Sequence, residues 1–412
     1  MKKLLASLLV GIAGFGAASR SVWAQAVPDR PGGVRPVPRT QPRIAPLPET
    51  QWTDVHRTLA ARFAPDGPVL APDGTGRAGN DLKTLLHVPE MVEGLMPFNV
   101  YVSSASSLSP RHREILILRT AWLCGNQYVW SSHAALAKTL GLTAGEIRRI
   151  AEGAAARGWD PFEATLLRVT DQIYRNSSIA DSTWDALKAR YDLYHLMDAV
   201  MTVTDFTTLS IMYNAMGVQP DEGVVERLPI GIPYRVVVPE REPPLNTARV
   251  DPVDGSGLAI ARTFARYPKL AEPRSRNSNY VNQRSKLMPR YREMLILRTG
   301  WNCRSEYEWA QHVGSVGRAR DYGLDPVRIA EGPDAPGWDP FEAALLRAAD
   351  ELYRDATLSD RTWNILAARF DTTMMMNVVV TASNYRMVSM ALNALGVQLD
   401  PGDERFPKLA SP

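Results

Sequence analysis

Residues 108–133 read LSPRHREILILRTAWLCGNQYVWSSH, and residues 287–312 repeat them as LMPRYREMLILRTGWNCRSEYEWAQH. The two stretches begin 179 residues apart and are identical at 15 of 26 positions. The same offset pairs WDPFEATLLRVTDQIYR with WDPFEAALLRAADELYR, and YNAMGVQ with LNALGVQ. A repeat of this length predicts a tandem duplication, in which each copy folds into the same domain.

Each copy carries the start and stop signals of helices, and the alternating pattern of strands is almost absent. Asp160 and Asp339 are each followed by a proline and, three positions on, by a glutamate, which predicts a helix cap with a capping box. Ser305 and Glu308 have the same spacing. The expected helix starts are Ser109, Asp160, Asp181, Asp339 and Asp360, and the expected ends of the last helices are Gly217 and Gly396. The sequence therefore predicts an all-α protein of two domains.

The overall composition limits the kinds of partner. The chain has 412 residues, 45% of them apolar, which is enough for two domains that each bury a core. The formal net charge is +3, and the predicted leader accounts for three positive charges, so the mature chain is close to neutral. A nucleic-acid or anionic membrane partner is therefore not expected. The expected partner is a small-molecule substrate.

The ends and connections show distinct compositions. Lys2 and Lys3, a short apolar run and the exit Val22-Trp23-Ala24 predict a cleaved signal peptide, and hence a periplasmic or secreted protein without a membrane anchor. A Pro-rich segment follows, expected to be a tether or an extended arm. The predicted organisation is a signal peptide (1–24), a Pro-rich linker (25–50), a first domain (51–223), a connecting strap (224–250), a second domain (251–402) and a tail (403–412).

A glutamate and a histidine recur at the same spacing in both copies. Glu114 precedes His133 by 19 residues, and Glu293 precedes His312 by 19. One continuous helix would hold each pair about 28 Å apart. The predicted helix breaks are Gly125-Asn126 and Arg304-Ser305. Because a tight turn lets two helices fold back on each other, we expect the carboxylate and the imidazole to meet.

Such a pair supports acid–base chemistry. A carboxylate that binds an imidazole fixes its tautomer and raises its basicity, which makes the histidine a general base near neutral pH. The alternative is a buried structural ion pair that ties two helices together. The aromatic residues expected to wall the substrate pocket are Tyr128, Trp130, Tyr307 and Trp309, and the cysteines expected at its border are Cys124 and Cys303.

A glutamate in a helix ending LRT, followed by N-C-x-x-x-Y-E-W-x-x-H at 302–312, resembles the carboxymuconolactone decarboxylase family. This family shares the alkylhydroperoxidase D-like all-α fold. The resemblance covers about 80–220 and 260–400. It implies that Glu114, His133, Glu293 and His312 match the family's proton-relay residues, that no cofactor is needed, and that the two copies pair as a pseudo-dimer. It also implies a homo-oligomer, possibly a trimer of two-domain chains.

The sequence departs from the peroxidase branch of this fold. That branch carries a C-x-x-C pair seven and four residues before the histidine, where this chain has Asn126 and Val129, or Ser305 and Glu308. Dithiol reduction of a peroxide therefore lacks its two thiols. We expect acid–base chemistry on a lactone, keto acid or similar carbonyl compound. A peroxidase that uses a single cysteine and a non-catalytic binding or assembly protein remain as alternatives.

Other charged and sulfur-bearing residues have simpler interpretations. Cys124 and Cys303 are expected to be small buried residues, or to form one disulfide between the copies. Buried arginines are expected to pair with acids, with a substrate carboxylate as the alternative partner. The expected pairs are Arg119 with Asp171 and Arg298 with Asp350. His56, His87, His112 and His195 show no ligand spacing, so a metal site is not expected.

The two copies differ just before the repeated helix. The first has EGLMPFNVYVSSASS at 93–107, which is mostly apolar, and the second has EPRSRNSNYVNQRSK at 272–286. If this segment borders the pocket, the first site has an apolar wall and the second is polar, altered or inactive. The sequence does not decide which site works.

Overall fold

The computed structural model describes residues 38–64, 69–70, 76–234, 238, 240–241 and 243–409. The predicted signal peptide and the first part of the predicted linker lie outside these residues. The regular secondary structure of these residues is helical except for a two-stranded antiparallel hairpin, in which β1 (Val69–Leu70) pairs with β2 (Gly76–Arg77). The predicted all-α class is confirmed.

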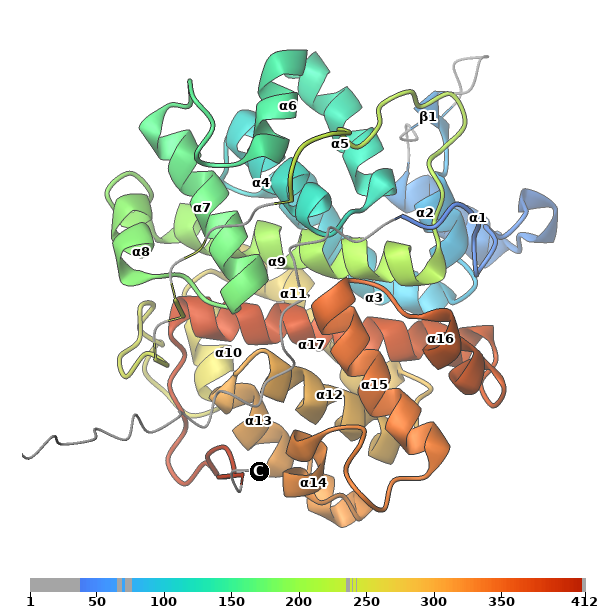
Figure 1. The fold of residues 1–412 in the computed structure, drawn as a ribbon, viewed down its shortest axis with the longest axis vertical. Coiled ribbons are helices and arrows are strands. Elements are labelled where there is room, and N and C mark those ends of the chain that lie inside the picture. The colour runs from blue at the N-terminus through green and yellow to red at the C-terminus, as the bar shows by residue number, and fades with distance from the viewer. Residues whose placement is uncertain are drawn as a thin grey trace, which may run out of the picture.

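Helices follow one another in the first half of the chain, from a short 3-10 turn to a long central helix (Figure 1). In order they are η3 (Glu49–Gln51), α1 (Asp54–Phe63), α2 (Asn80–Leu85), α3 (Pro89–Val100), η4 (Tyr101–Ala105), α4 (Pro110–Leu123), α5 (Gln127–Thr139), α6 (Ala144–Glu152), α7 (Pro161–Asn176), α8 (Asp181–Lys188) and α9 (Leu193–Met216).

The second half repeats this order. Its helices are α10 (Ala259–Phe264), α11 (Pro268–Asn279), η5 (Tyr280–Arg284), α12 (Pro289–Asn302), α13 (Glu306–Val313), η6 (Ala319–Tyr322), α14 (Pro326–Glu331), α15 (Pro340–Asp355), α16 (Asp360–Ala367) and α17 (Thr372–Leu395). Helices α10–α13 and α15–α17 each begin 179 residues after α2–α5 and α7–α9. The offset of the sequence repeat therefore recurs in the helix boundaries.

The two long helices α9 and α17 lie side by side across the middle of the molecule (Figure 1). Thr208 of α9 donates a hydrogen bond to the carbonyl of Ser383 in α17, at 3.0 Å. Nearly every residue of both helices is buried, because each is covered on all sides. One large core therefore runs through both copies, and a smaller separate core, which includes Trp301 and Trp309, lies within the second copy. The expectation that each copy buries a core of its own is wrong for the large core. None of the described helices is long and apolar enough to cross a membrane.

The predicted caps are only partly right. Asp160 and Asp339 cap α7 and α15 with a proline at the first position, and Gly217 ends α9 with φ of +74°. The predicted capping boxes at α7 and α15 are wrong. Glu163 accepts a hydrogen bond from Arg111 Nε at 2.6 Å, and its counterpart in the second copy likewise binds an arginine. An arginine offers a charge-assisted bond, which is stronger than a bond from a backbone N–H.

The described part of the Pro-rich linker is packed on the protein. Arg43 N donates to the carbonyl of Met216 at the end of α9, at 2.9 Å. The Arg43 side chain binds Asp360 and lies over the ring of Trp363, both in α16 of the other copy. Between the two earlier possibilities, an extended arm is therefore correct for residues 38–48 and a tether is wrong.

A second arm makes the same contacts in reverse. Arg249 N donates to the carbonyl of Leu395 at the end of α17, at 3.1 Å. The Arg249 side chain binds Asp181 and lies over the ring of Trp184, both in α8 of the first copy. Each copy thus extends an arginine onto the other, as two subunits related by a twofold axis would.

Candidate acid–base sites

The helix break forms where the sequence predicts it. In the first copy α4 ends at Leu123, Gly125 takes φ of +61°, and Asn126 begins α5 by accepting a hydrogen bond from Val129 N at 2.7 Å. The Asn126 side chain also donates to the carbonyl of Ser210 in α9. These bonds fix the turn and fold α5 back against α4.

The break in the second copy uses different residues. Arg304 takes the left-handed conformation with φ of +51°, which costs energy for a residue with a Cβ. Ser305 begins α13, but its hydroxyl caps nothing, so the predicted capping box with Glu308 is wrong. The Glu308 carboxylate instead binds His312 Nε2 at 3.0 Å. A charged imidazolium is the stronger partner for a buried carboxylate.

The predicted contact between glutamate and histidine is present in the first copy. Glu114 Oε2 lies 2.9 Å from His133 Nδ1. Glu114 is completely buried in α4, whereas the His133 side chain is 16% exposed. The ring of Phe206 meets the imidazole edge-on, with centroids 4.9 Å apart. Glu114 therefore orients the ring from Nδ1, and no partner is seen for Nε2 within the described part of the chain.

The histidine of the second copy lies between two carboxylates. Glu293 Oε2 lies 2.6 Å from His312 Nδ1, and Glu308 Oε1 lies 3.0 Å from Nε2. Arg292 Nε donates to the other oxygen of Glu293 at 3.2 Å. Burial alone would lower the pKa of His312, but the charge of Glu293, reinforced by hydrogen bonds to both carboxylates, raises it to about 10. His312 is therefore an imidazolium at neutral pH.

Each histidine borders a cavity. The first cavity is about 80 Å³, and the second is about 240 Å³. The first is lined by Asp81, Asn99, Ser103, Tyr128, Val129, Ser132, His133, Phe206, Leu209 and Tyr213. The second is lined by Leu258, Ile260, Ala261, Arg274, Ser278, Asn282, Tyr307, Glu308, Gln311, His312, Val316, Asn384, Tyr385 and Val388. The second cavity has room for the larger molecule.

Arg274 brings a positive charge to the second cavity. Its guanidinium lies over the ring of Phe264, with 4.1 Å between the Cζ atom and the ring centroid. Its Nε is buried without a hydrogen-bond partner, and no ion pair joins it to a carboxylate among the described residues. Burial lowers the pKa of Arg274 to about 10, with the charge of Glu308 opposing the shift. This cation is available to an anionic group in the cavity.

The aromatic residues divide into two pairs. Tyr128 and Tyr307 line the cavities, as expected. Trp130 and Trp309 do not, which corrects that expectation. Trp309 packs against Trp301 and against Phe406, which the C-terminal segment supplies. The predicted tail thus covers the face of α13 that carries Trp309, so the Trp309 indole is part of a core.

The cysteines also lie away from the cavities. Cys124 and Cys303 are both fully buried and both free, so the possible disulfide between the copies is absent. Neither thiol borders either histidine's cavity, so they are not pocket residues. Burial raises the pKa of Cys124 to about 12 and also raises the pKa of Cys303. Both sulfurs are therefore thiols at neutral pH.

The buried arginines pair with aspartates as predicted. Arg119 donates to both oxygens of Asp171, from Nε at 2.7 Å and from Nη2 at 3.1 Å. Arg298 does the same with Asp350, at 2.6 and 3.1 Å. Arg119 also donates to two carbonyls near the end of α6, and Arg298 to two near the end of α14. These guanidiniums are fully used within the fold, and neither lines the cavities.

The segment before the repeated helix does not form an apolar wall. From 93–107, only Asn99 and Ser103 line the first cavity. The apolar side chains of this segment turn into the shared core, where α3 packs against α11 of the other copy. The corresponding residues of the second copy, Ser278 and Asn282, line its cavity. Both walls are polar here, so the predicted apolar wall of the first site is wrong, while Arg274 from the same segment of the second copy adds a charge to the second wall.

Three charged residues that line the cavities were not predicted from the sequence. Asp81 and Arg274 were not named, and Glu308 was named as part of a capping box but not as a cavity residue. A comparison of the two copies gives a signal for each, because the counterparts at an offset of 179 are Ile260, Leu95 and Val129. A charge that replaces an apolar residue in one copy marks a position where the copies differ in chemistry.

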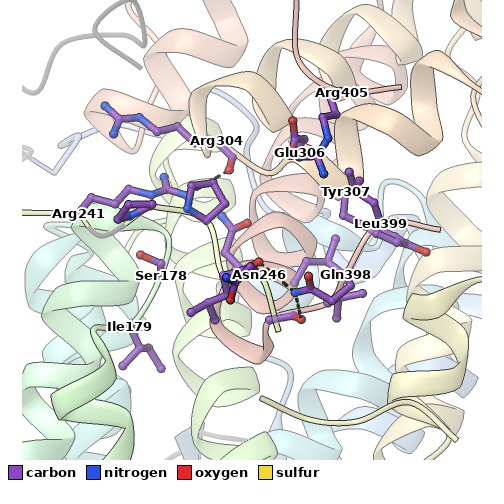
Figure 2. Close-up of a pocket in the computed structure, with 17 residues that line it drawn as sticks. Ser178, Ile179, Arg241, Asn246, Arg304, Glu306, Tyr307, Gln398, Leu399 and Arg405 are labelled. Carbon is purple, nitrogen blue, oxygen red and sulfur yellow. Dashed lines mark hydrogen bonds and ion pairs between the residues drawn. The ribbon is translucent and has the colours of Figure 1, made fainter. Parts of the chain in front are cut away.

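A separate cavity of about 310 Å³ lies between residues 241 and 243–246 of the connecting strap, the second copy, and Ser178 and Ile179 of the first copy (Figure 2). Arg241 lines it and donates to the carbonyls of Cys303 and Arg304, which follow the end of α12. Arg405 binds Glu306 at 2.9 Å on another wall. No histidine borders this cavity, so it lacks the acid–base pair of the other two. Over the described ranges, no group of three or more His, Cys, Asp or Glu side chains is arranged to hold a metal ion.

Comparison with known families agrees with this architecture. Residues 89–172 match the model of the carboxymuconolactone decarboxylase family. The matched segment runs from the start of α3 into α7 and includes both Glu114 and His133. A search of curated proteins found no match. Residues 89–172 of the first copy therefore form a segment of the carboxymuconolactone decarboxylase type.

Proposed function

We propose that this chain is an exported acid–base enzyme of the carboxymuconolactone decarboxylase type, acting on a small lactone or other carbonyl compound by decarboxylation or proton transfer. One observation carries the proposal. In the second copy, a continuous relay from Glu293 through His312 to Glu308 ends at a cavity of about 240 Å³ that also holds Arg274. A buried structural ion pair needs neither the cavity nor the second carboxylate.

The relay suits proton transfer because short contacts join the three side chains in one line, from Glu293 through both nitrogens of His312 to Glu308. His312 is positively charged and binds Glu308 at the cavity wall through Nε2, at 3.0 Å. Glu308 then takes a proton from a carbon beside the substrate carbonyl, and the C–H electrons move toward the carbonyl oxygen. Arg274 stabilises the negative charge that develops there or on a substrate carboxylate. The same Glu308, once protonated, returns the proton to carbon.

Decarboxylation follows the same path. The electrons of the broken C–C bond move into the substrate's own carbonyl, carbon dioxide leaves, and the replacing proton passes from the His312 imidazolium through Glu308 to carbon. Water then reprotonates His312. In the first copy Val129 stands in place of Glu308, so His133 itself faces the cavity. The first site would therefore use the imidazole directly as its base.

The competing functions have less support. A peroxidase that uses one cysteine needs an accessible thiolate, whereas Cys124 and Cys303 are buried thiols with raised pKa values. A non-catalytic assembly protein has no need of open space beside the histidines, and both histidines border a cavity.

The central experiment is substitution in the full chain. His133→Ala, His312→Ala and the double variant are assayed on a panel of lactones and keto acids. We expect the double variant to lose turnover at least 100-fold, which is the usual contribution of a general base. Glu308→Gln should impair the second site, and Glu306→Gln is its matched control, because Glu306 lies on the same helix but binds Arg405. Unchanged turnover in the double variant rejects the proposal.

Export and assembly are parts of the proposal with tests of their own. Mass spectrometry of protein recovered from the periplasm or medium should find a chain that begins after Ala24. Light scattering of the mature protein should give a mass of several chains if domains of this type assemble into rings. A mass of one chain would reject the oligomer and leave the acid–base chemistry in place.

A further inference from the structure

The cavity of the first copy has an acid that the second copy lacks. Asp81, in the first turn of α2, lines the same cavity as His133. Its counterpart in the second copy is Ile260. In the second cavity the lining carboxylate is Glu308, whose counterpart in the first copy is Val129. Each cavity thus combines one histidine with one lining carboxylate, which comes from a different helix in each copy.

Asp81 shares a phenol with a second carboxyl group. The Tyr128 hydroxyl lies 2.7 Å from Asp81 Oδ1 and 2.9 Å from Asp221 Oδ2. The same Asp81 oxygen accepts from Leu82 N at 2.6 Å, and the other Asp221 oxygen accepts from Asn80 N at 2.7 Å. Both carboxyl groups are therefore held in place by backbone as well as by the phenol.

The count of protons requires one of these acids to be neutral. The Tyr128 hydroxyl carries one hydrogen and can donate to one carboxylate only. The second short oxygen–oxygen contact places two lone pairs face to face unless the carboxyl group carries a proton. In the described part of the chain, neither Asp81 nor Asp221 forms an ion pair with a lysine or arginine, and the nearby Lys83 binds Glu49. The pair therefore holds a shared proton.

Burial acts in the same direction. It raises the pKa of Asp81 and of Asp221, while the hydrogen bonds from Tyr128 and the backbone act against the shift. The Tyr213 hydroxyl also lies 3.2 Å from Asp81 Oδ2, so the carboxyl group contacts two phenols. A carboxylic acid surrounded in this way is kept neutral and can donate a hydrogen bond.

Gly79 leaves room for this arrangement. A Cβ atom there would lie 2.4 Å from the Tyr128 oxygen, 2.7 Å from Asp81 Oδ1 and 3.0 Å from Asp221 Oδ2. The second copy has Leu258 at this position, and its Tyr307 hydroxyl contacts one carboxylate, Asp400, at 2.9 Å. A Cβ at position 79 would crowd the phenol and both acids, so the glycine leaves the space in which all three meet.

We propose that Asp81, as a neutral carboxylic acid, is the proton donor of the first cavity and works there with His133 on an uncharged carbonyl compound. This inference rests on the proposed acid–base function. His133 Nε2 removes a proton from the carbon beside the carbonyl, and the C–H electrons form a C=C bond. The carbonyl oxygen takes the Asp81 proton and becomes an enol hydroxyl. In a β,γ-unsaturated ketone or lactone this enol is a dienol. Return of the proton from His133 to its γ carbon, and of the hydroxyl proton to Asp81, moves the C=C bond and completes an isomerisation.

The two cavities then differ in the charge of their substrates. In the first, Asp81 and Asp221 disfavour an anion, and the smaller volume admits only a small compound. In the second, Arg274 favours an anion. A substrate for the first site is therefore a small neutral ketone or lactone, and a substrate for the second carries a carboxylate.

The protonation state can be tested without activity. Infrared spectra of the full chain at pH 7, recorded for wild type and Asp81→Asn, should differ by the carbonyl stretch of one carboxylic acid. Asp54→Asn is the control, because that aspartate is fully exposed and should contribute no such band. If Asp81→Asn does not fold, Asp221→Asn should weaken the same band, since its negative partner is gone. A wild-type spectrum without the band overturns the proposal.

Activity is tested in a His312→Ala background, which silences the second cavity. Adding Asp81→Asn should lower turnover of small neutral ketones and lactones by roughly 10²-fold or more and remove the alkaline limb of the pH profile, where Asp81 would lose its proton. Unchanged turnover would overturn the role of Asp81 while the His133→Ala, His312→Ala double variant still tests the proposed function. If no variant and not even the wild type turns over any carbonyl compound, the proposed function fails, and the proton-donor role fails with it.

Discussion

The charge of His312 offers the most direct physical test of the second site, and Glu308→Gln is the change that tests it. Glutamine keeps the shape of the side chain and can still accept a hydrogen bond from His312 Nε2, but it removes one of two negative charges. The other, on Glu293, stays 2.6 Å from Nδ1. The pKa of His312 should therefore fall and yet remain above the ordinary histidine value.

The size of the effect follows from the geometry. In the folded wild type the pKa of His312 is about 10, against 6.5 for an ordinary histidine. This difference of 3.5 pKa units corresponds to ~5 kcal/mol at most, at 1.36 kcal/mol per unit. One opposite charge at this distance shifts a pKa by roughly 1–3 units. Glu308→Gln should therefore bring the pKa of His312 down to between about 7 and 9.

The sign of the pH dependence is fixed by the raised pKa. The stabilisation from protonated His312 is fully present below pH 6.5, because the unfolded histidine is then protonated as well. It declines as the pH rises from 6.5 and is lost above about 10, where the folded protein releases its proton. Over this window the wild type should lose stability more steeply than Glu308→Gln does.

Nuclear magnetic resonance of the imidazole nitrogens measures the pKa directly. The His312 signal is assigned by its absence in His312→Gln, and the titration is compared between wild type, Glu308→Gln and the control Glu306→Gln. We expect the control to match the wild type. A wild-type His312 that titrates near 6.5, or a Glu308→Gln variant with an unchanged pKa, would refute the relay on which the proposed function depends.

Three further predictions concern the surrounding structure. Arg298→Met leaves Asp350 buried without its partner and should cost ~3–5 kcal/mol in denaturant unfolding, while Arg347→Met, whose partner is exposed, should cost under ~1 kcal/mol. Both cysteine thiols should resist a thiol reagent and peroxide in the folded protein and react once it unfolds; rapid labelling of the native protein would contradict their burial. Gly317→Ala would place a Cβ 2.3 Å from Glu293 Oε2, so it should lower the free energy of unfolding by ~1–3 kcal/mol, and an unchanged melting temperature would argue against this packing.

Features set by local signals or by the repeat itself were predictable from the sequence. Proline and aspartate at a helix start, and glycine at a helix end, act within one turn, so α7 begins and α9 ends where their residues indicate. The fold-back of α5 on α4 follows from Gly125 and Asn126 alone. The contact of Glu114 with His133 then needs only the known geometry of two antiparallel helices.

Features that depend on a distant segment were not predictable. Ser305 and Glu308 have the spacing of a capping box, but the carboxylate binds His312, which offers it a charge. Trp309 lies one helical turn from His312, yet its indole packs against Phe406 from the end of the chain, in a core away from the cavity. Spacing along a helix tells which side chains share one face of it. The neighbouring segments of the fold decide which face borders a cavity.

The arms show how a signal can be present and still be missed. Arg43-Ile44-Ala45-Pro46 and Arg249-Val250-Asp251-Pro252 share the pattern of an arginine, a β-branched residue and a proline. They stand 206 residues apart, because residues that include α1 and the β1–β2 hairpin are inserted in the first copy. An alignment at one fixed offset does not pair them, although their contacts with α9 and α17 are equivalent.

The distribution of charge between the copies bears on what the duplication achieved. Both copies keep the glutamate and histidine that form the buried pair, while the lining carboxylate comes from α2 in one and from α13 in the other. If the pair served only to join two helices, a lining acid in each cavity would have no function, and burying it would only cost stability. Two different solutions that each place one acid beside the histidine argue that a cavity with a proton donor or acceptor is what both copies retain.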